Sequence, residues 1–248
     1  MFPVICRIGP LTVYSYGLML ALAVLICAYC MSRDGRRYQI PPEKVYDFIF
    51  WCVVSGILGG RLLFVFLNAG FFIQHPLEIL MLQHGGLAWQ GALTGGGLGG
   101  WFYIRQQGLP LGLMLDLSAP YVALGQAIGR IGCFLNGCCY GREVSWGIYF
   151  PVHDARLHPT QLYSAAGLLM IFFILKGFQR RTNIPGRLMV LYLILTSAQR
   201  FGVQFFRADH IPVWAGMSVF QIFSVAIFMA GLLLDRLFVM RHRRKRSS

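Results

Sequence analysis

Long apolar runs, separated by short polar segments, dominate the pattern of this chain. Seven such runs occur, at about 13–32, 46–67, 87–104, 113–135, 160–178, 187–205 and 214–239. A helix crosses the hydrocarbon of a bilayer in about 20 residues, and each run has about that length. The pattern therefore predicts an all-α, polytopic integral membrane protein with seven transmembrane helices, built as a single membrane domain over residues 1–248.

The third run is rich in glycine, as the stretch "GGLAWQGALTGGGLGGW" (Gly85–Trp101) shows. In water so many glycines would weaken a helix, whereas in a bilayer small residues let two helices approach closely. We therefore expect the third span to pack tightly against a neighbour. No small-residue cleavage site follows the first apolar run, so we interpret that run as a retained span and not as a cleaved signal peptide.

Composition agrees with the membrane prediction. Hydrophobic residues make up 56% of the chain and charged residues 12%, whereas a soluble domain has roughly 45–50% and about 25%. The net charge of +13 comes from short loops and the C-terminal "RHRRKRSS". Basic segments that flank apolar runs set membrane orientation and meet anionic lipid. The charge therefore indicates a lipid bilayer as partner and argues against nucleic acid.

The distribution of lysine and arginine predicts the orientation. With seven spans, the side that holds the C-terminus carries 15 of the 22 basic residues, and such an excess marks the cytoplasmic side. The N-terminus is then outside and the C-terminus cytoplasmic, with outward loops at about 68–86 and 136–159 and a basic cytoplasmic tail at 240–248.

Three arginines lie inside apolar runs: Arg61, Arg130 and Arg200, all in the outward half of their spans. A charge at the centre of a span costs roughly 2.5–3.5 kcal/mol or more, unless its side chain reaches the headgroup level. Arginines at similar depth in three helices favour a shared anionic site. A phospholipid phosphate is the simplest ligand, since the guanidinium donates two parallel hydrogen bonds and stays charged.

The seven cysteines show no pair of CxxC motifs. We therefore expect no structural zinc site, and we expect no cofactor. Cys138 and Cys139 are adjacent, and a bridge from either to Cys133 or Cys6 would need Cα atoms within about 7 Å. Alternatively, a free cysteine beside arginines would have a lowered pKa and could act as a nucleophile.

Six stretches resemble the prolipoprotein diacylglyceryl transferase family. "GRIGCFLNGCCYG" (Gly129–Gly141) is similar to the signature of that family. The others follow in the family's order: "YSYGLM" (14–19), "GGRLLFVF" (59–66), "HPTQLY" (158–163), "QRFGVQFFR" (199–207) and "GMSVFQIFS" (216–224). Each stretch alone is a weak signal, whereas their order, their spacing and the seven spans together are specific.

The resemblance implies an activity and its partners. Members of the family transfer the diacylglyceryl group of phosphatidylglycerol to the lipobox cysteine thiol of a preprolipoprotein signal peptide. They form a thioether, release glycerol 1-phosphate, use no metal, and work at the outer face of the bacterial cytoplasmic (inner) membrane as multi-pass proteins. We therefore expect a transferase of lipoprotein biosynthesis.

The same resemblance implies roles for individual residues. Arg130 and Arg200 match the family's two essential arginines and would stabilise the phosphate as it leaves. Tyr16 matches a functional tyrosine. The remaining matches are binding, turn or structural positions: Asn136, Gly137, Gly141, Arg207, Arg61 and His158.

The third span departs from the family pattern. In the frame of "QHGGLAWQGAL" that keeps the family's spacing to Arg130, Gln90 takes the place of the residue often proposed as base. A second frame places His84 there. Glutamine cannot accept a proton at physiological pH, so Gln90 cannot be a general base. Further departures from usual residues occur at Cys133, Cys138, Ser164 and Gln204.

Two interpretations follow from these departures. In the first, the enzyme is active and uses His84, His158 or Tyr16 near the thiol, or its arginines alone lower the pKa of the thiol. In the second, the chain is a diverged, non-enzymatic lipid-binding paralogue or a lipid transporter. A transporter would be expected to carry paired internal repeats, and the glycine-rich third span has no counterpart four spans later.

Overall fold

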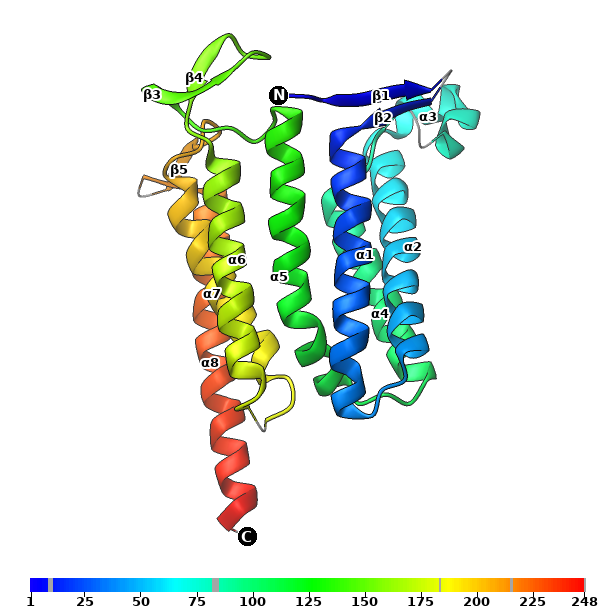
Figure 1. Ribbon diagram of the computed structural model, residues 1–248, viewed down its shortest axis with the longest axis vertical. Helices are drawn as coiled ribbons and strands as arrows, with labels where there is room; N and C mark the ends of the chain where they lie inside the picture. The colour runs from blue at the N-terminus through cyan, green and yellow to red at the C-terminus, as the bar shows by residue number, and fades with distance from the viewer. Residues whose placement is uncertain (9–10, 82–84, 183, 215, 248) are drawn as a thin grey trace. The chain divides into compact units, whose positions relative to one another are not determined.

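The computed structural model describes residues 1–8, 11–81, 85–182, 184–214 and 216–247, and most of them are helical (Figure 1). The long helices are α1 (Ser15–Gly35), α2 (Pro42–Leu67), α4 (Trp89–Gln106), α5 (Leu111–Asn136), α6 (Thr160–Gln179), α7 (Arg187–Gln204) and α8 (Val219–Ser247). Short helical segments are η1 (Arg36–Tyr38), α3 (Ala69–Gln74) and η2 (Pro76–Leu80). The seven long helices coincide with the seven predicted apolar runs.

Within the residues that the structure describes, five helices are long and apolar enough to cross a membrane: Ser15–Tyr38, Pro42–Leu67, Leu111–Asn136, Thr160–Gln179 and Val219–His242. The protein is therefore consistent with a polytopic membrane protein. Helices α4 and α7, with 18 residues each, fall outside this group, because glycines lower the hydropathy of α4 and polar side chains that of α7. Seven spans and the placement of the termini stay predictions.

In the described residues, three short antiparallel hairpins precede or connect the helices, and the all-α prediction did not include them. They are β1 (Val4–Ile8) with β2 (Leu11–Tyr14), β3 (Glu143–Phe150) with β4 (Ala155–Leu157), and β5 (Pro212–Trp214) with β6 (Met217–Ser218). Each sheet has only two strands. Strands as short as these leave no long alternation of apolar and polar residues, so the sequence pattern did not indicate the hairpins. In β3 only Gly147 and Phe150 are buried, which leaves most of this hairpin exposed.

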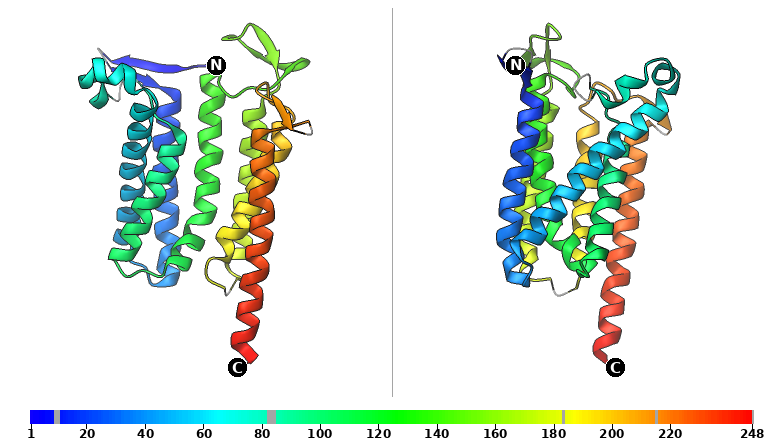
Figure 2. Two further views of the ribbon diagram at one scale, coloured as in Figure 1. Left: turned by 180° about the vertical axis from the view of Figure 1, so that it is seen from behind. Right: turned by 90° about the vertical axis from the view of Figure 1, so that its right-hand side faces the viewer.

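The chain divides into two compact units. Unit 1 comprises Met1–Met31 and Leu115–Ser248, and unit 2 comprises Ser32–Met114. In unit 1, α7 and α8 lie side by side (Figure 2), and all three hairpins lie at the end of the helices opposite the C-terminus (Figure 1). Its core is an apolar cluster of Ala119, Ala123, Ile171, Leu175, Leu188 and Tyr192.

In unit 2, α2 packs closely against α4 through facing glycines. A Cβ added at Gly59 would lie 2.5 Å from the carbonyl oxygen of Gly91 and 2.9 Å from the Cα of Gly95. No side chain fits in that space, so the helix backbones are in direct contact. The prediction that the glycine-rich third span packs tightly against a neighbour is confirmed.

Candidate functional site

The turn that follows α5 carries the signature residues of the sequence. Gly137 and Cys139 both have positive φ, +76° and +61°, a conformation that glycine adopts freely and cysteine rarely. Two side chains at the start of α6 hold the turn. Thr160 Oγ1 donates to the Cys139 carbonyl at 2.8 Å, and Gln161 Nε2 donates to the Cys138 carbonyl at 2.6 Å. The strained backbone of Cys139 is thus fixed from outside.

Backbone hydrogen bonds join this turn to the end of α7. The Gly141 amide donates to the His158 carbonyl at 2.9 Å, and the Arg142 amide donates to the Phe206 carbonyl at 2.9 Å. A Cβ added at Gly141 would lie 2.5 Å from His158 Cβ and 2.7 Å from Thr160 Cγ2. Only glycine fits there, so the match of Gly141 to a family turn position has a physical reason in this fold.

Three arginines of unit 1 meet beside the turn. Arg200 on α7 is in the electrostatic environment of both Arg130 on α5 and Arg207 just after α7. Arg207 donates from Nε and Nη2 to the two carboxylate oxygens of Asp209, each at 2.7 Å. These hydrogen bonds hold the pKa of Asp209 below its usual value, although partial burial opposes them.

Arg130 and Arg200 are not paired in this way. Over the described part of the chain, the ion pairs join Arg207 to Asp209 and Arg187 to Asp235, and neither includes Arg130 or Arg200. The Arg200 guanidinium instead lies 5.1 Å from the centre of the Phe220 ring. The three arginines and Asp209 together therefore have a net charge of +2. This charge favours the binding of an anionic ligand.

Three thiols lie next to these arginines. The sulfur atoms of Cys133, Cys138 and Cys139 all lie within 4.8 Å of one another. Hydrogen bonds from the other two thiols are the largest cause of a lowered pKa at Cys139, burial opposes this shift, and the charges of Arg207 and Arg130 add to it. The three thiols and these two arginines therefore share one electrostatic environment.

Tyr16 lies at the start of α1, near the same groups. Its electrostatic environment includes Arg130 and all three thiols, and its ring is 3.4 Å from where a Cβ on Gly132 would lie. Tyr16 is 43% exposed, so it lies at the border of the site.

His158 has an aromatic environment. Its ring lies 4.7 Å from that of Trp146 and 5.4 Å from that of Phe206, measured between ring centres. Its Nδ1 is 3.2 Å from the Tyr163 hydroxyl. These contacts hold the imidazole in place at the start of α6. Asn136 interacts differently, through a side-chain hydrogen bond with the Cys138 thiol.

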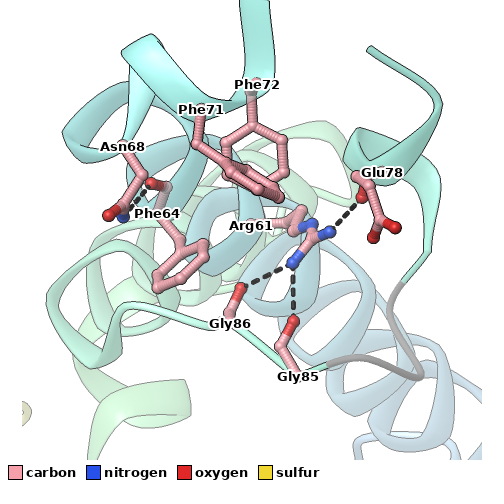
Figure 3. A pocket seen from close by; sticks show the side chains of 8 residues that line it. All are labelled: Arg61, Phe64, Asn68, Phe71, Phe72, Glu78, Gly85 and Gly86. Carbon is pink, nitrogen blue, oxygen red and sulfur yellow. Dashed lines mark hydrogen bonds between the residues drawn. The ribbon is translucent and has the colours of Figure 1, made fainter. Parts of the chain in front are cut away.

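Arg61 belongs to unit 2, and its donors are occupied (Figure 3). Arg61 is 7% exposed, and its guanidinium carbon lies 5.3 Å from the centre of the Phe72 ring. Its five N–H groups face five backbone carbonyl oxygens, those of Glu78, Ile79, Met81, Gly85 and Gly86. Arg61 also lines a pocket of about 530 Å³, but no donor remains free for a phosphate in this arrangement.

The two candidate base positions differ in what the structure describes. Gln90 is the second residue of α4, exposed, in unit 2, and its carbonyl accepts a hydrogen bond from Thr94 Oγ1 at 2.9 Å. His84 lies outside the described residues.

Sequence reasoning missed several residues of the site. Asp209 forms the ion pair of Arg207, and the close spacing of "RAD" was an available signal. Thr160 and Gln161 were quoted only as part of a motif, yet they anchor the turn that carries Cys138 and Cys139. Gln204, noted as a departure, donates to Asp209 at 3.3 Å.

Comparison with known proteins gives one family. The family model described as "Prolipoprotein diacylglyceryl transferase" matches residues 3–236. Curated proteins named phosphatidylglycerol–prolipoprotein diacylglyceryl transferase are similar over nearly their whole length. That of Clostridium tetani is 32% identical, covering 94% of this chain and 96% of its own. That of Bordetella avium is 36% identical, with coverages of 98% and 95%. The chain therefore belongs to the prolipoprotein diacylglyceryl transferase family.

Proposed function

We propose that this protein transfers the diacylglyceryl group of phosphatidylglycerol to the lipobox cysteine thiol of a preprolipoprotein. Membership of the family carries the reaction class. The observation that carries the site is the meeting of Arg130, Arg200 and Arg207 beside the turn after α5 with a single paired carboxylate. The reaction takes place in the bacterial cytoplasmic membrane, with the N-terminus and this turn outside and all seven long helices crossing.

The charge of the arginine group suits the reaction. The substrate sulfur attacks the glycerol carbon that carries the phosphate, the S–C bond forms, and the C–O bond breaks with its electron pair on glycerol 1-phosphate. A phosphodiester with one negative charge thereby becomes a monoester with about −1.5 to −2 charges at pH 7. Arg130 and Arg200 stabilise this increase more than they stabilise the bound lipid, which is the condition for acceleration.

Activation of the substrate thiol does not require Gln90. Hydrogen bonds from Cys133 and Cys138 are the largest cause of the lowered pKa of the Cys139 thiol, and the positive charges of Arg207 and Arg130 add to it. A substrate thiol that enters the same field loses its proton more easily for the same reason. We therefore assign thiol activation to the arginine field, with Tyr16 at the border of the site. His84, His158 and Gln90 then need not act as a base, and the thiol proton passes to water.

Binding roles follow from the same arrangement. Asn136, Gly137 and Gly141 shape the turn that the lipid headgroup contacts, and Arg207 is oriented by Asp209. We assign to Arg61 the role of holding the segment before α4 in place, since its donors already have acceptors.

The test is transfer by the full-length protein in phosphatidylglycerol vesicles with a lipobox peptide. We expect Arg130→Ala and Arg200→Ala to lower peptide lipidation and glycerol phosphate release by about 10²–10³-fold, the usual loss when one group that stabilises developing charge is removed. Lysine at either position keeps the charge but loses the two-pronged hydrogen bonding, so activity should be intermediate. The exposed arginine on β4, replaced in Arg156→Ala, is the matched control.

The other candidate is a lipid-binding paralogue, and the glutamine at position 90 favours it. It predicts that the wild-type protein binds phosphatidylglycerol and releases no glycerol phosphate. If transfer occurs and both alanine variants keep the wild-type rate, the arginine mechanism is wrong.

A further inference from the structure

We propose that Cys133, Cys138 and Cys139 form a binding site for one soft, thiophilic metal ion, of which zinc is the common biological example. The site lies in unit 1, beside the arginines, and uses residues to which the proposed transfer assigns no chemical step. Among the residues that the structure describes, no other group of three or more histidine, cysteine or acidic side chains has its ligand atoms gathered in this way.

The distances suit such an ion. Zinc binds thiolate sulfur at about 2.3 Å, so three sulfurs around one ion lie about 4 Å apart. The three sulfur atoms here all lie within 4.8 Å of one another without an ion. Small changes of side-chain torsion would close the remaining difference. Zinc is usually four-coordinate, and the fourth position would be taken by water or an exogenous ligand.

The backbone holds the three cysteines close together. Cys133 is in the last turn of α5, and the Cys138 amide donates to its carbonyl at 3.1 Å. Cys139 has a positive φ, which turns the chain back on itself. The thiols of Cys138 and Cys139 both lie near the thiol of Cys133. Thr160 and Gln161 fix the carbonyls of Cys139 and Cys138. The ligands are thus already positioned, which lowers the entropy lost when an ion binds.

A disulfide explains this arrangement less well. Adjacent cysteines such as Cys138 and Cys139 are poorly placed to bond to each other, because the short ring strains the backbone between them. A bridge from Cys133 to either one would leave the third sulfur without a role. Three thiolates around one ion use all three sulfurs, and soft thiolate ligands select zinc or copper(I) among biological metals.

The arginines favour the charge of the complex. Three thiolates and one Zn²⁺ carry a net charge of −1, whereas three thiols are neutral. Both Arg130 and Arg207 are in the electrostatic environment of Cys139. Their positive charges therefore stabilise the anionic complex. The same complex would weaken the attraction of these arginines for a lipid phosphate. If the proposed transfer function is correct, zinc should slow it.

The test is a titration with Co²⁺, which replaces zinc and absorbs visible light. Reduced, full-length protein in detergent micelles is freed of reductant and titrated without oxygen. We expect one Co²⁺ per chain, with the d–d bands of a tetrahedral site and the charge-transfer band of sulfur ligands. Cys133→Ser, Cys138→Ser and Cys139→Ser should each lower the affinity by at least about tenfold. Cys30→Ser, on α1, should match the wild type.

A second measurement protects the test against variants that fold poorly. In the wild-type protein, Zn²⁺ should slow maleimide labelling of these three cysteines, and a chelator should restore it. Wild-type protein without sulfur-to-cobalt absorption would overturn the proposal, as would a spectrum unchanged in all three variants. A Cys133–Cys138 disulfide that persists in peptide mass spectra after reduction and Co²⁺ addition would also overturn it. The cobalt spectrum is independent of lipid transfer, so failure of the proposed function leaves this result interpretable.

Discussion

Replacing Arg61 with methionine keeps an unbranched stem and removes the five N–H groups that face backbone carbonyls in unit 2. A hydrogen bond from a charged donor contributes about 1.5–3 kcal/mol, so five of them set an upper bound of roughly 7–15 kcal/mol. A pocket of about 530 Å³ lies beside Arg61, and freed carbonyls can turn to water there. We therefore expect a loss of about 3–5 kcal/mol, because one or two of the carbonyls stay without a donor at about 1–3 kcal/mol each.

Amide hydrogen exchange measures this loss where it occurs. The Glu78 amide donates to the His75 carbonyl at 3.1 Å, and the Met81 amide donates to the Glu78 carbonyl at 3.2 Å. If the segment detaches from Arg61, both amides become accessible. A loss of about 3–5 kcal/mol corresponds to exchange about a hundredfold to a few thousandfold faster.

Two further variants make the experiment specific. An ammonium group has three donors, so Arg61→Lys can keep at most about three of the five bonds and should show intermediate exchange. Arg105→Met removes the same charge from an exposed position on α4 and should leave these amides unchanged. Wild-type exchange rates at Glu78 and Met81 in Arg61→Met would refute the structural role of Arg61.

Three other changes test packing, charge and the turn. Gly91→Ala places a Cβ 2.7 Å from Leu63 Cβ, and this overpacking should cost about 1–3 kcal/mol of stability. Gly97→Ala is the control, since its Cβ would have no atom within 4 Å, and it should be neutral or stabilising. Thermal unfolding in detergent compares the two variants. Asp209 has a lowered pKa, so its contribution, at most about 1 kcal/mol for a partly exposed pair, is present above the unfolded pKa of about 3.9 and is lost as pH falls through the lower folded value. In thermal unfolding, the wild-type advantage over Asp209→Asn should therefore shrink only below about pH 4, and an advantage that grows as pH falls below that value contradicts this. Gly141→Ala should lower peptide lipidation, because its Cβ would clash with the start of α6. Gly177→Ala is the control, since nothing lies within 4 Å of its Cβ, and it should not lower lipidation. Equal lipidation rates in the two variants would contradict the packing argument.

The positions of the seven long helices could be predicted because their signal is local. A helix in a bilayer satisfies its own backbone hydrogen bonds and exposes apolar side chains on most sides, so each apolar run indicates a helix by itself. The glycines of α4 also predicted a structural feature locally. A helix with so little side-chain volume packs closely against a neighbour, and the run of glycines can be seen in the sequence alone. The hairpins were missed, because strands as short as those in Pro212–Ser218 have no such local signature.

The arginines show where local reasoning stops. The sequence identified Arg61, Arg130 and Arg200 as costly charges inside apolar runs, and suggested one ligand for all three. The structure places Arg61 in unit 2 with five carbonyl acceptors and groups Arg130 and Arg200 with Arg207 in unit 1. The cost of a charge can be read from its apolar neighbours in sequence, whereas the atoms that neutralise it come from segments that only folding brings near.

The sequence by itself identified the family and predicted a helical membrane protein with arginines at costly positions, because hydropathy and short motifs are properties of contiguous residues. Only the tertiary structure decided which groups act together. Cys133 and Cys138 were noted as departures from the family pattern, and the absence of paired CxxC motifs argued against a metal. The three thiols gather because a helix end, a positive φ and two anchors from α6 coincide. Metal ligation depends on distances between side chains, and those distances are set by the turn and its anchors.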